Sequence, residues 1–141
     1  MADNLTLHFV VPGDDFSRAG EASSNIKKTL KQLGFPPSII RKVAISLYEG
    51  EINMVIHAGG GEIDAVVCPD KIELTLADKG PGIADIELAF QEGYSTATED
   101  VRDLGFGAGM GLPNMREYTD YIEIESVLGE GTTVRLIILN K

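Results

Sequence analysis

Glycine occupies every second position in the stretch GFGAGMG, from Gly105 to Gly111. This loop runs into a predicted helix at Leu112 and Pro113, where unpaired backbone N–H groups and the positive end of the helix dipole favour an anion. Phosphate binding is therefore the chemistry that the segment predicts. The segment is not a dinucleotide-binding fingerprint, because Met110 stands where the third glycine is required, and the chain has no Gly-Lys-Ser/Thr sequence of a P-loop. A loop without a ligand is the alternative.

A second candidate is Asp78 in the stretch ADKGPGI, which follows a β-rich run. Asp78 would lie at the carboxyl end of that strand. Gly80 and Gly82 would let the following turn approach a flat ligand closely, because glycine has no Cβ. A buried aspartate at this place could accept an N–H group. The same residue types are common in plain surface turns, so the pattern alone leaves both interpretations open.

A polar stripe is predicted on the helix that contains EGEINMVIH, where Glu49, Asn53 and His57 recur every four residues. Each step of four residues turns an α-helix by about 40°, so the three side chains project from nearly one side. Three isoleucines flank the stripe, which indicates that it borders a pocket with an apolar wall: Ile45, Ile52 and Ile56. An ordinary solvated face is the alternative, with His57 complementing the helix dipole. Glu51 falls inside the apolar arc, and we expect it either to snorkel to water or to mark an imperfect helix end.

The surrounding pattern predicts the elements that position these residues. Residues 4–11 alternate as a strand, residues 15–33 and 37–58 have helical periodicity, and antiparallel hairpins are indicated over 62–78 and 121–139. Short helices are expected at 84–91 and 113–118. This order lacks the strand and helix alternation of a doubly wound parallel sheet. It predicts one domain over residues 1–141 with an α+β fold, a two-layer sandwich of sheet and helices.

Composition and charge narrow the class of protein. The 141 residues are 43% hydrophobic, no apolar run is long enough to span a membrane, and no secretory signal opens the chain. Cys68 is the only cysteine, which excludes an internal disulfide and favours the cytoplasm. The formal net charge of −10 argues against nucleic-acid binding. Residues 27–42 carry five cations and no acid, and this basic stretch either binds an acidic partner or is a solvated face.

Taken together, the motifs resemble those of the GHKL superfamily of ATPases over residues 40–139. The Glu49, Asn53 and His57 stripe is similar to its N box. Residues 78–82 are similar to its first glycine box, residues 105–111 to its second, and residues 131–133 to its closing strand. Among the branches, the chain looks like the stand-alone bacterial anti-sigma-factor serine kinases and stressosome switch kinases. The resemblance implies the Bergerat type of ATP-binding fold, with a mixed, mostly antiparallel sheet covered by helices on one face and an ATP lid at about residues 90–111.

The resemblance also implies roles for individual residues. Glu49 would be the catalytic base, Asn53 would coordinate Mg²⁺ through its side-chain oxygen, and Asp78 would accept the amino group of adenine. Thr133 or, equally by sequence, Thr132 would help to hold the base. The complete set of residues that would contact ATP is Asn53, His57, Asp78, Gly80, Gly82, Ile83, Gly105, Gly107, Ala108, Gly109, Met110, Gly111, Leu112, Thr132 and Thr133.

Three functions follow from this resemblance. The first is an ATP- and Mg²⁺-dependent serine/threonine protein kinase that phosphorylates or sequesters a regulatory protein, such as a sigma factor or an anti-sigma antagonist, in a bacterial partner-switching system. The second is a noncatalytic ATP-binding switch. The third, a detached histidine-kinase domain, is disfavoured because no helical phosphoacceptor region precedes the ATP domain and His8 falls in a predicted strand. The family often dimerises, so a homodimer is among the expected assemblies.

Overall fold

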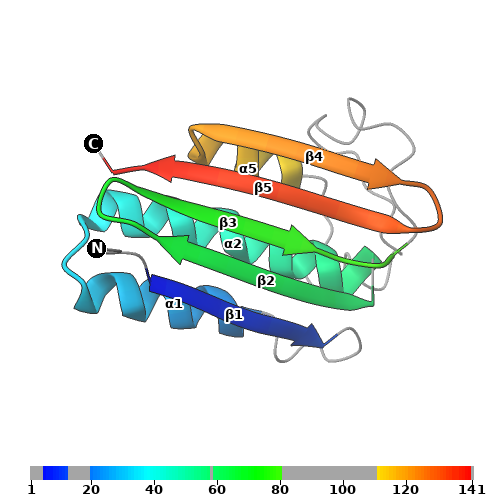
Figure 1. Cartoon of the computed structure of the whole chain (residues 1–141), viewed down its shortest axis with the longest axis horizontal. Coiled ribbons are helices and arrows are strands. Elements are labelled where there is room, and N and C mark those ends of the chain that lie inside the picture. Colours follow the sequence, from blue (N-terminus) through cyan, green and yellow to red (C-terminus); the bar gives the residue numbers. More distant parts are fainter. Residues whose placement is uncertain (1–4, 13–19, 58, 81–110, 141) are drawn as a thin grey trace.

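The computed structural model describes residues 5–12, 20–57, 59–80 and 111–140 (Figure 1). Within these ranges the chain forms five strands and three helices. The strands are β1 (Leu5–Pro12), β2 (Gly60–Val67), β3 (Lys71–Ala77), β4 (Tyr121–Val127) and β5 (Gly131–Leu139), and the helices are α1 (Glu21–Gln32), α2 (Pro37–His57) and α5 (Gly111–Tyr118).

The strands form one sheet in the order β1-β2-β3-β5-β4. Two of its pairs are the predicted hairpins, β2 with β3 and β4 with β5. Alternation of side chains sets the register, because a slip by one residue would turn the buried set to the other face. In β3, for example, Ile72, Leu74 and Leu76 are buried while the residues between them are partly exposed. The predicted α+β class is confirmed. Every strand pair in the described residues is antiparallel, so this part of the sheet is not mixed.

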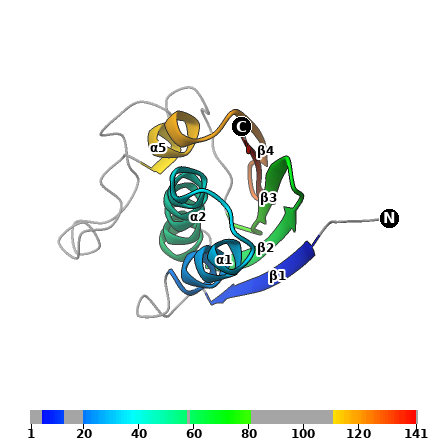
Figure 2. The same ribbon diagram turned by 90° about the vertical axis from the view of Figure 1, so that its left-hand side faces the viewer.

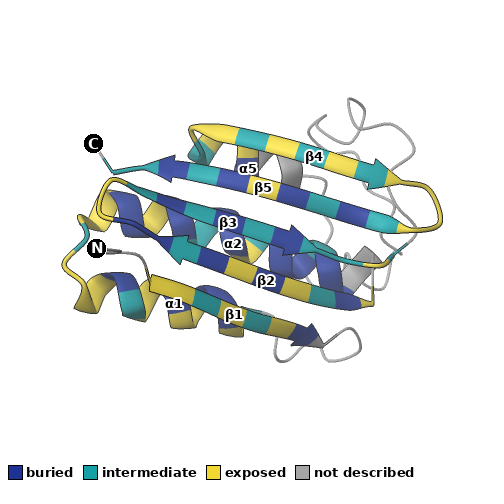
Figure 3. Ribbon diagram, in the orientation of Figure 1, coloured by how far each residue is buried: buried dark blue, intermediate teal, exposed yellow. Residues whose placement is uncertain are grey.

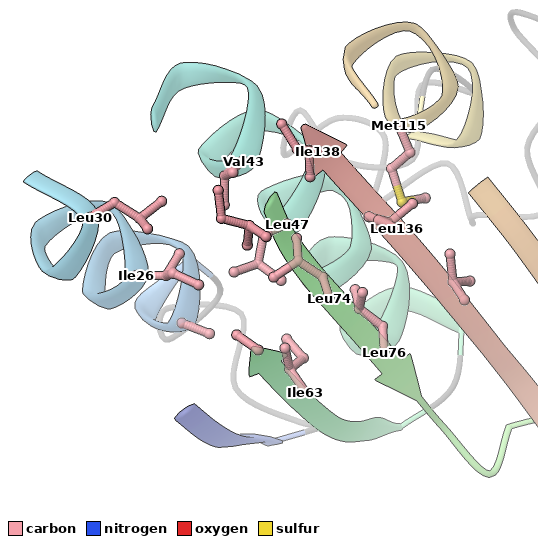
Figure 4. Close-up of a cluster of buried hydrophobic side chains, with 14 of the residues drawn as sticks. Ile26, Leu30, Val43, Leu47, Ile63, Leu74, Leu76, Met115, Leu136 and Ile138 are labelled. Atoms are coloured by element: carbon pink, nitrogen blue, oxygen red, sulfur yellow. The ribbon is translucent and has the colours of Figure 1, made fainter. Parts of the chain in front are cut away.

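All three helices pack on one face of the sheet, which gives the two predicted layers, with α2 between α1 and α5 (Figure 2). Buried and more exposed residues alternate along β2 and β5 (Figure 3). The core between the layers consists of aliphatic side chains and methionines (Figure 4). Its labelled members are Ile26, Leu30, Val43, Leu47, Ile63, Leu74, Leu76, Met115, Leu136 and Ile138.

The helix boundaries follow local signals. α2 begins at Pro37, whose fixed φ suits a first helical turn, and ends at His57, one residue before the predicted end. α1 begins at Glu21, because Gly20 has a φ of 99°, a left-handed conformation that cannot continue a helix. The predicted helix therefore does not run unbroken from residue 15. The predicted helix at 84–91 lies outside the described residues. No helix in the described ranges is both long and apolar enough to cross a bilayer.

α2 approaches the sheet closely at two glycines. A Cβ at Gly50 would overlap Cδ2 of Leu76, so this contact requires glycine. On the sheet side, a Cβ at Gly61 would lie 2.5 Å from the carbonyl oxygen of Ala77 and 3.0 Å from the sulfur of Met54. These contacts place the carboxyl-terminal half of α2, which carries the predicted polar stripe, over the adjoining ends of β2 and β3.

Candidate functional site

Asp78 directly follows β3 and is hydrogen-bonded to the start of β5. Its N–H donates to the carbonyl oxygen of Thr132 at 2.9 Å, and the N–H of Thr132 donates to its Oδ1 at 3.1 Å. Oδ1 also accepts the N–H of Gly80 at 3.0 Å, which closes the predicted turn. Among the described residues, Oδ2 accepts no hydrogen bond. This oxygen therefore keeps its capacity to accept an N–H from a ligand.

Strand alternation places Asp78 and Thr132 on the helix-covered face of the sheet. Asp78 continues the buried series that includes Leu76, and Thr132 has the parity of the buried Val134. Thr132 itself is only 8% exposed. Thr133 pairs with the residue before Asp78 and points to the opposite face. The sequence left the two threonines equal as candidates; the register puts Thr132 beside Asp78.

The hydroxyl of Thr132 is held in place by β4. Its Oγ1 lies 2.9 Å from Oγ of Ser126, and this serine hydroxyl also donates to the carbonyl oxygen of Gly131 at 3.3 Å. Gly131 has a φ of 134°, and a Cβ there would overlap the backbone carbonyl of Asp78. Glycine at this position is therefore what lets β5 begin directly against the Asp78 turn.

α2 reaches this place through Met54. A Cβ at Gly61 would lie 3.0 Å from the sulfur of Met54 and 3.2 Å from Cβ of Asp78, so both side chains lie against Gly61 in β2. Asn53, the preceding residue of α2, and Glu49, one turn earlier, are both half-buried. The described part of the polar stripe is therefore only partly exposed to solvent, and Met54 brings the end of α2 close to the Asp78 turn.

The apolar wall predicted beside the stripe is partly described. Ile52 is buried and Ile45 is half-buried. The side chains of Ile56 and His57 lie outside the described part of the chain, although His57 is the last residue of α2.

The beginning of α5 lies at the same end of the molecule as the end of β3, the start of β5 and the end of α2 (Figure 1). Gly111 and Leu112 lie in the first turn of α5, where the sequence predicts that the glycine-rich loop runs into a helix. The other predicted glycine-loop positions lie outside the described residues, namely Gly82, Ile83, Gly105, Gly107, Ala108, Gly109 and Met110.

Glu51 is the residue that sequence reasoning misjudged. It neither snorkels nor ends the helix: it is 1% exposed, and its carboxylate accepts N–H groups from the start of α1. Burial raises the pKa of Glu51, and the hydrogen bonds from the backbone of Ser23, Ala22 and Gly20 oppose that shift. A cavity of about 240 Å³ lies between β1 and α1 and reaches Glu51, but neither Asn53 nor Asp78 lines it.

The two-layer fold, with an aspartate at the end of β3 and a polar stripe on α2, is the arrangement that the sequence predicts for an ATP-binding domain. Residues 44–141 match the family described as histidine kinase-, DNA gyrase B-, and HSP90-like ATPase. This chain belongs to that family, and membership implies ATP binding.

Relatives by sequence include a kinase and an anti-sigma factor. The serine/threonine-protein kinase RsbT of Bacillus subtilis (strain 168) is 30% identical over 115 residues, covering 79% of this chain and 80% of that relative. The anti-sigma F factor of Caldanaerobacter subterraneus subsp. tengcongensis is 37% identical over 100 residues, covering 67% of this chain and 65% of the relative. This chain thus spans just under two thirds of the second relative's length.

Two solved structures share the fold. The structure of the RsbU and RsbW domains of Rv1364c from Mycobacterium tuberculosis superposes with a TM-score of 0.65 at 16% identity, covering 97% of this chain and 33% of that chain. The mycobacterial sensor histidine kinase MprB superposes with a TM-score of 0.54 at 13% identity, covering 97% of this chain and 99% of that one. At these identities the likeness concerns the fold alone.

Proposed function

We propose that this chain is an ATP- and Mg²⁺-dependent serine/threonine protein kinase of the anti-sigma-factor type, which phosphorylates or sequesters a regulatory protein in a bacterial partner-switching system. The observation that carries the proposal is that Met54, which follows Asn53 in α2, and Asp78 at the end of β3 both lie against Gly61 of β2. The similarity to RsbT and to an anti-sigma F factor supports the class of partner.

Asp78 and Thr132 would bind adenine. Oδ1 of Asp78 accepts two backbone N–H groups, which fix the carboxylate plane, and Oδ2 would accept the amino group of adenine. The Thr132 hydroxyl, oriented by Ser126, would add a second polar contact to the base, directly or through water. Guanine presents a carbonyl oxygen where adenine has its amino group, so the carboxylate selects for adenine.

Asn53 would hold Mg²⁺. A carboxamide oxygen is a hard ligand, and Mg²⁺ in nucleotide sites commonly takes one or two protein oxygens plus substrate phosphates and water. The half-buried position of Asn53 fits this sparse donor set. Backbone N–H groups of residues 105–111 and the amino-terminal end of α5 would bind the phosphates.

Glu49 would act on the acceptor hydroxyl, one helical turn from Asn53. In the proposed transfer the serine oxygen bonds to the γ-phosphorus, the bond from that phosphorus to the bridging oxygen of ADP breaks, and Glu49 takes the hydroxyl proton. Because phosphoryl transfer depends mainly on positioning and charge neutralisation, Mg²⁺ and the phosphate-binding amides would contribute more than proton removal.

The protein would act in the cytoplasm on a regulatory protein such as a sigma factor or an anti-sigma antagonist, as a monomer or a homodimer. The test is incubation with γ-labelled ATP, Mg²⁺ and a candidate antagonist protein. We expect label on a serine or threonine of the antagonist. Tight ATP binding without transfer would contradict the kinase and leave the noncatalytic ATP-binding switch. No ATP binding at all would contradict both functions.

A further inference from the structure

The first turn of α1 is capped by a residue of another helix. Oε2 of Glu51 accepts the N–H groups of Gly20 at 2.9 Å and Ala22 at 3.2 Å, and Oε1 accepts the N–H of Ser23 at 2.7 Å. These are groups that a helix leaves without intrahelical partners at its start. Gly20 has no side chain with which to cap them. Glu51 therefore takes the place of a local cap, from α2.

Two further contacts tie the same turn of α1 to α2. The hydroxyl of Ser23 donates to the carbonyl oxygen of Ala44 at 2.8 Å. The ring of Tyr48 lies so close to Gly20 that a Cβ there would be 3.1 Å from Cε1. α1 thus contacts α2 at three successive turns, through Ala44, Tyr48 and Glu51. Together they fix how far α2 is rotated about its own axis.

That rotation matters because Glu51 and the polar stripe lie on opposite sides of α2. At 100° per residue, Glu51 is about 160° from both Glu49 and Asn53 around the helix. α2 lies between α1 and α5 (Figure 2). The hydrogen bond from Ser23 shows that the Glu51 side chain points to α1. A rotation of about 10° would move a polar atom roughly 6 Å from the helix axis by about 1 Å. A misplacement of about 1 Å can cost roughly a hundredfold in rate.

We propose that Glu51 is a positioning residue, which sets the rotation of α2 and thereby holds Glu49 and Asn53 in place for the magnesium nucleotide. This inference rests on the proposed ATP site and assigns it a supporting residue on the far side of the helix. A carboxylate suits the role because its two oxygens accept three N–H groups in fixed directions, which an apolar side chain cannot do.

The test compares Glu51→Gln with variants of similar stability that leave the α1 start unchanged. Gln retains the shape but replaces one accepting oxygen by an NH₂ group that faces backbone donors. We expect Glu51→Gln to lower the melting temperature by roughly 5–10 °C. The control variants are Ile26→Val and Leu30→Ala, a smaller and a larger truncation in the buried face of α1 beyond its first turn, whose losses of stability should lie on either side of that value.

The readout is the factor by which Mg²⁺ strengthens ATP binding, measured by calorimetry with and without the metal well below each melting temperature. In Glu51→Gln we expect this factor to fall about tenfold, as for residues that orient metal ligands, while both control variants keep the wild-type factor. If Mg²⁺ strengthens ATP binding to a folded Glu51→Gln protein by the same factor as in the wild type, the inference about Glu51 is overturned, but the proposed ATP site is not. Absence of ATP binding in the wild type would instead overturn the proposed function.

A second measurement on the unmodified protein applies if Glu51→Gln does not fold. If the hydrogen bonds between Glu51 and the start of α1 strengthen the binding of magnesium ATP, then by thermodynamic linkage magnesium ATP must stabilise those hydrogen bonds. We expect magnesium ATP to slow hydrogen exchange at the amides of Ala22 and Ser23 at least fivefold relative to Leu33 and Gly34 at the other end of α1. Equal slowing at both ends, or none, would overturn the inference.

Discussion

Asp78 and Thr132 are joined by two hydrogen bonds. The N–H of Asp78 donates to the carbonyl oxygen of Thr132 at 2.9 Å, and the N–H of Thr132 donates to Oδ1 of Asp78 at 3.1 Å. The pair ties the end of β3 to the start of β5 on the helix-covered face. It leaves Oδ2 of the aspartate as an acceptor, which is the basis of the adenine assignment and of the first two predictions.

Asp78→Asn should weaken ATP binding by about tenfold to a hundredfold, because the amide presents a donor or a weaker acceptor to the adenine amino group. The preference for ATP over GTP should fall with it. Calorimetry with both nucleotides measures this. Asp70→Asn, in the exposed β2–β3 turn, removes the same charge and should leave both affinities unchanged. An Asp78→Asn protein with wild-type affinity would contradict the assignment.

Thr132→Val and Thr133→Val form a matched pair, since the two residues are adjacent and face opposite sides of the sheet. Loss of the Thr132 hydroxyl should weaken ATP binding about threefold to tenfold, the range expected for one neutral hydrogen bond. Thr133→Val should leave it unchanged. If titration showed the larger effect for Thr133, the face on which the nucleotide is placed would be wrong.

Glu49→Gln should reduce phosphoryl transfer to the protein acceptor by roughly a hundredfold or more, with ATP affinity changed by less than about threefold. The reason is that Glu49 is proposed to act on the acceptor hydroxyl and not on the nucleotide. Transfer rates at saturating ATP, together with the ATP dissociation constant, separate the two effects. Equal losses in transfer and binding would show that Glu49 supports the pocket instead.

Gly50→Ala should destabilise the protein by about 1–3 kcal/mol, because the added Cβ overlaps Cδ2 of Leu76 in a packed core. Combining Gly50→Ala with Leu76→Ala removes the overlapping atom, so the double variant should be more stable than the sum of the two single changes predicts. Urea unfolding of the four proteins gives the coupling. Strict additivity would mean that α2 and β3 are not in contact at this point.

The pH dependence of stability should include a contribution from His8 in β1. Its hydrogen bond to Asp64 raises its pKa, as do the charges of Asp64 and Glu62, and the Nδ1–Oδ1 distance is 2.6 Å. Because the folded-state pKa is raised, the stabilisation is present below the unfolded pKa and is lost as pH rises through the folded value. Melting temperatures from about pH 5 to about pH 9 should fall less in Asp64→Asn than in the wild type or Asp70→Asn. Parallel curves would contradict this.

Local pattern was enough to predict most of the fold. The two hairpins follow from strand alternation and intervening turn residues, and α2 from helical periodicity with Pro37 at its start. The start of α1 was misplaced because helical periodicity continues through Gly20, whereas the backbone takes a left-handed φ there. The signal available in the sequence was Gly20 itself, which has no adjacent Ser, Thr, Asp or Asn that could cap a helix.

The candidate site was predictable only in part. Spacing predicts the Glu49 and Asn53 stripe. That Thr132 and not Thr133 lies on the same face as Asp78 follows only from the strand register, which is a tertiary property. Glu51 could not be interpreted from its own helix, because its partners are backbone groups 28 to 31 residues away in the chain. An acid inside an apolar arc signals a buried partner without saying where that partner lies.

The most direct test of the ATP site is a crystal structure of this chain grown with Mg²⁺ and a nonhydrolysable ATP analogue. The account predicts the adenine amino group within hydrogen-bond distance of Asp78 Oδ2 and the metal bound by the Asn53 side-chain oxygen. A nucleotide bound elsewhere, or one whose base and metal contact neither of these residues, would contradict it.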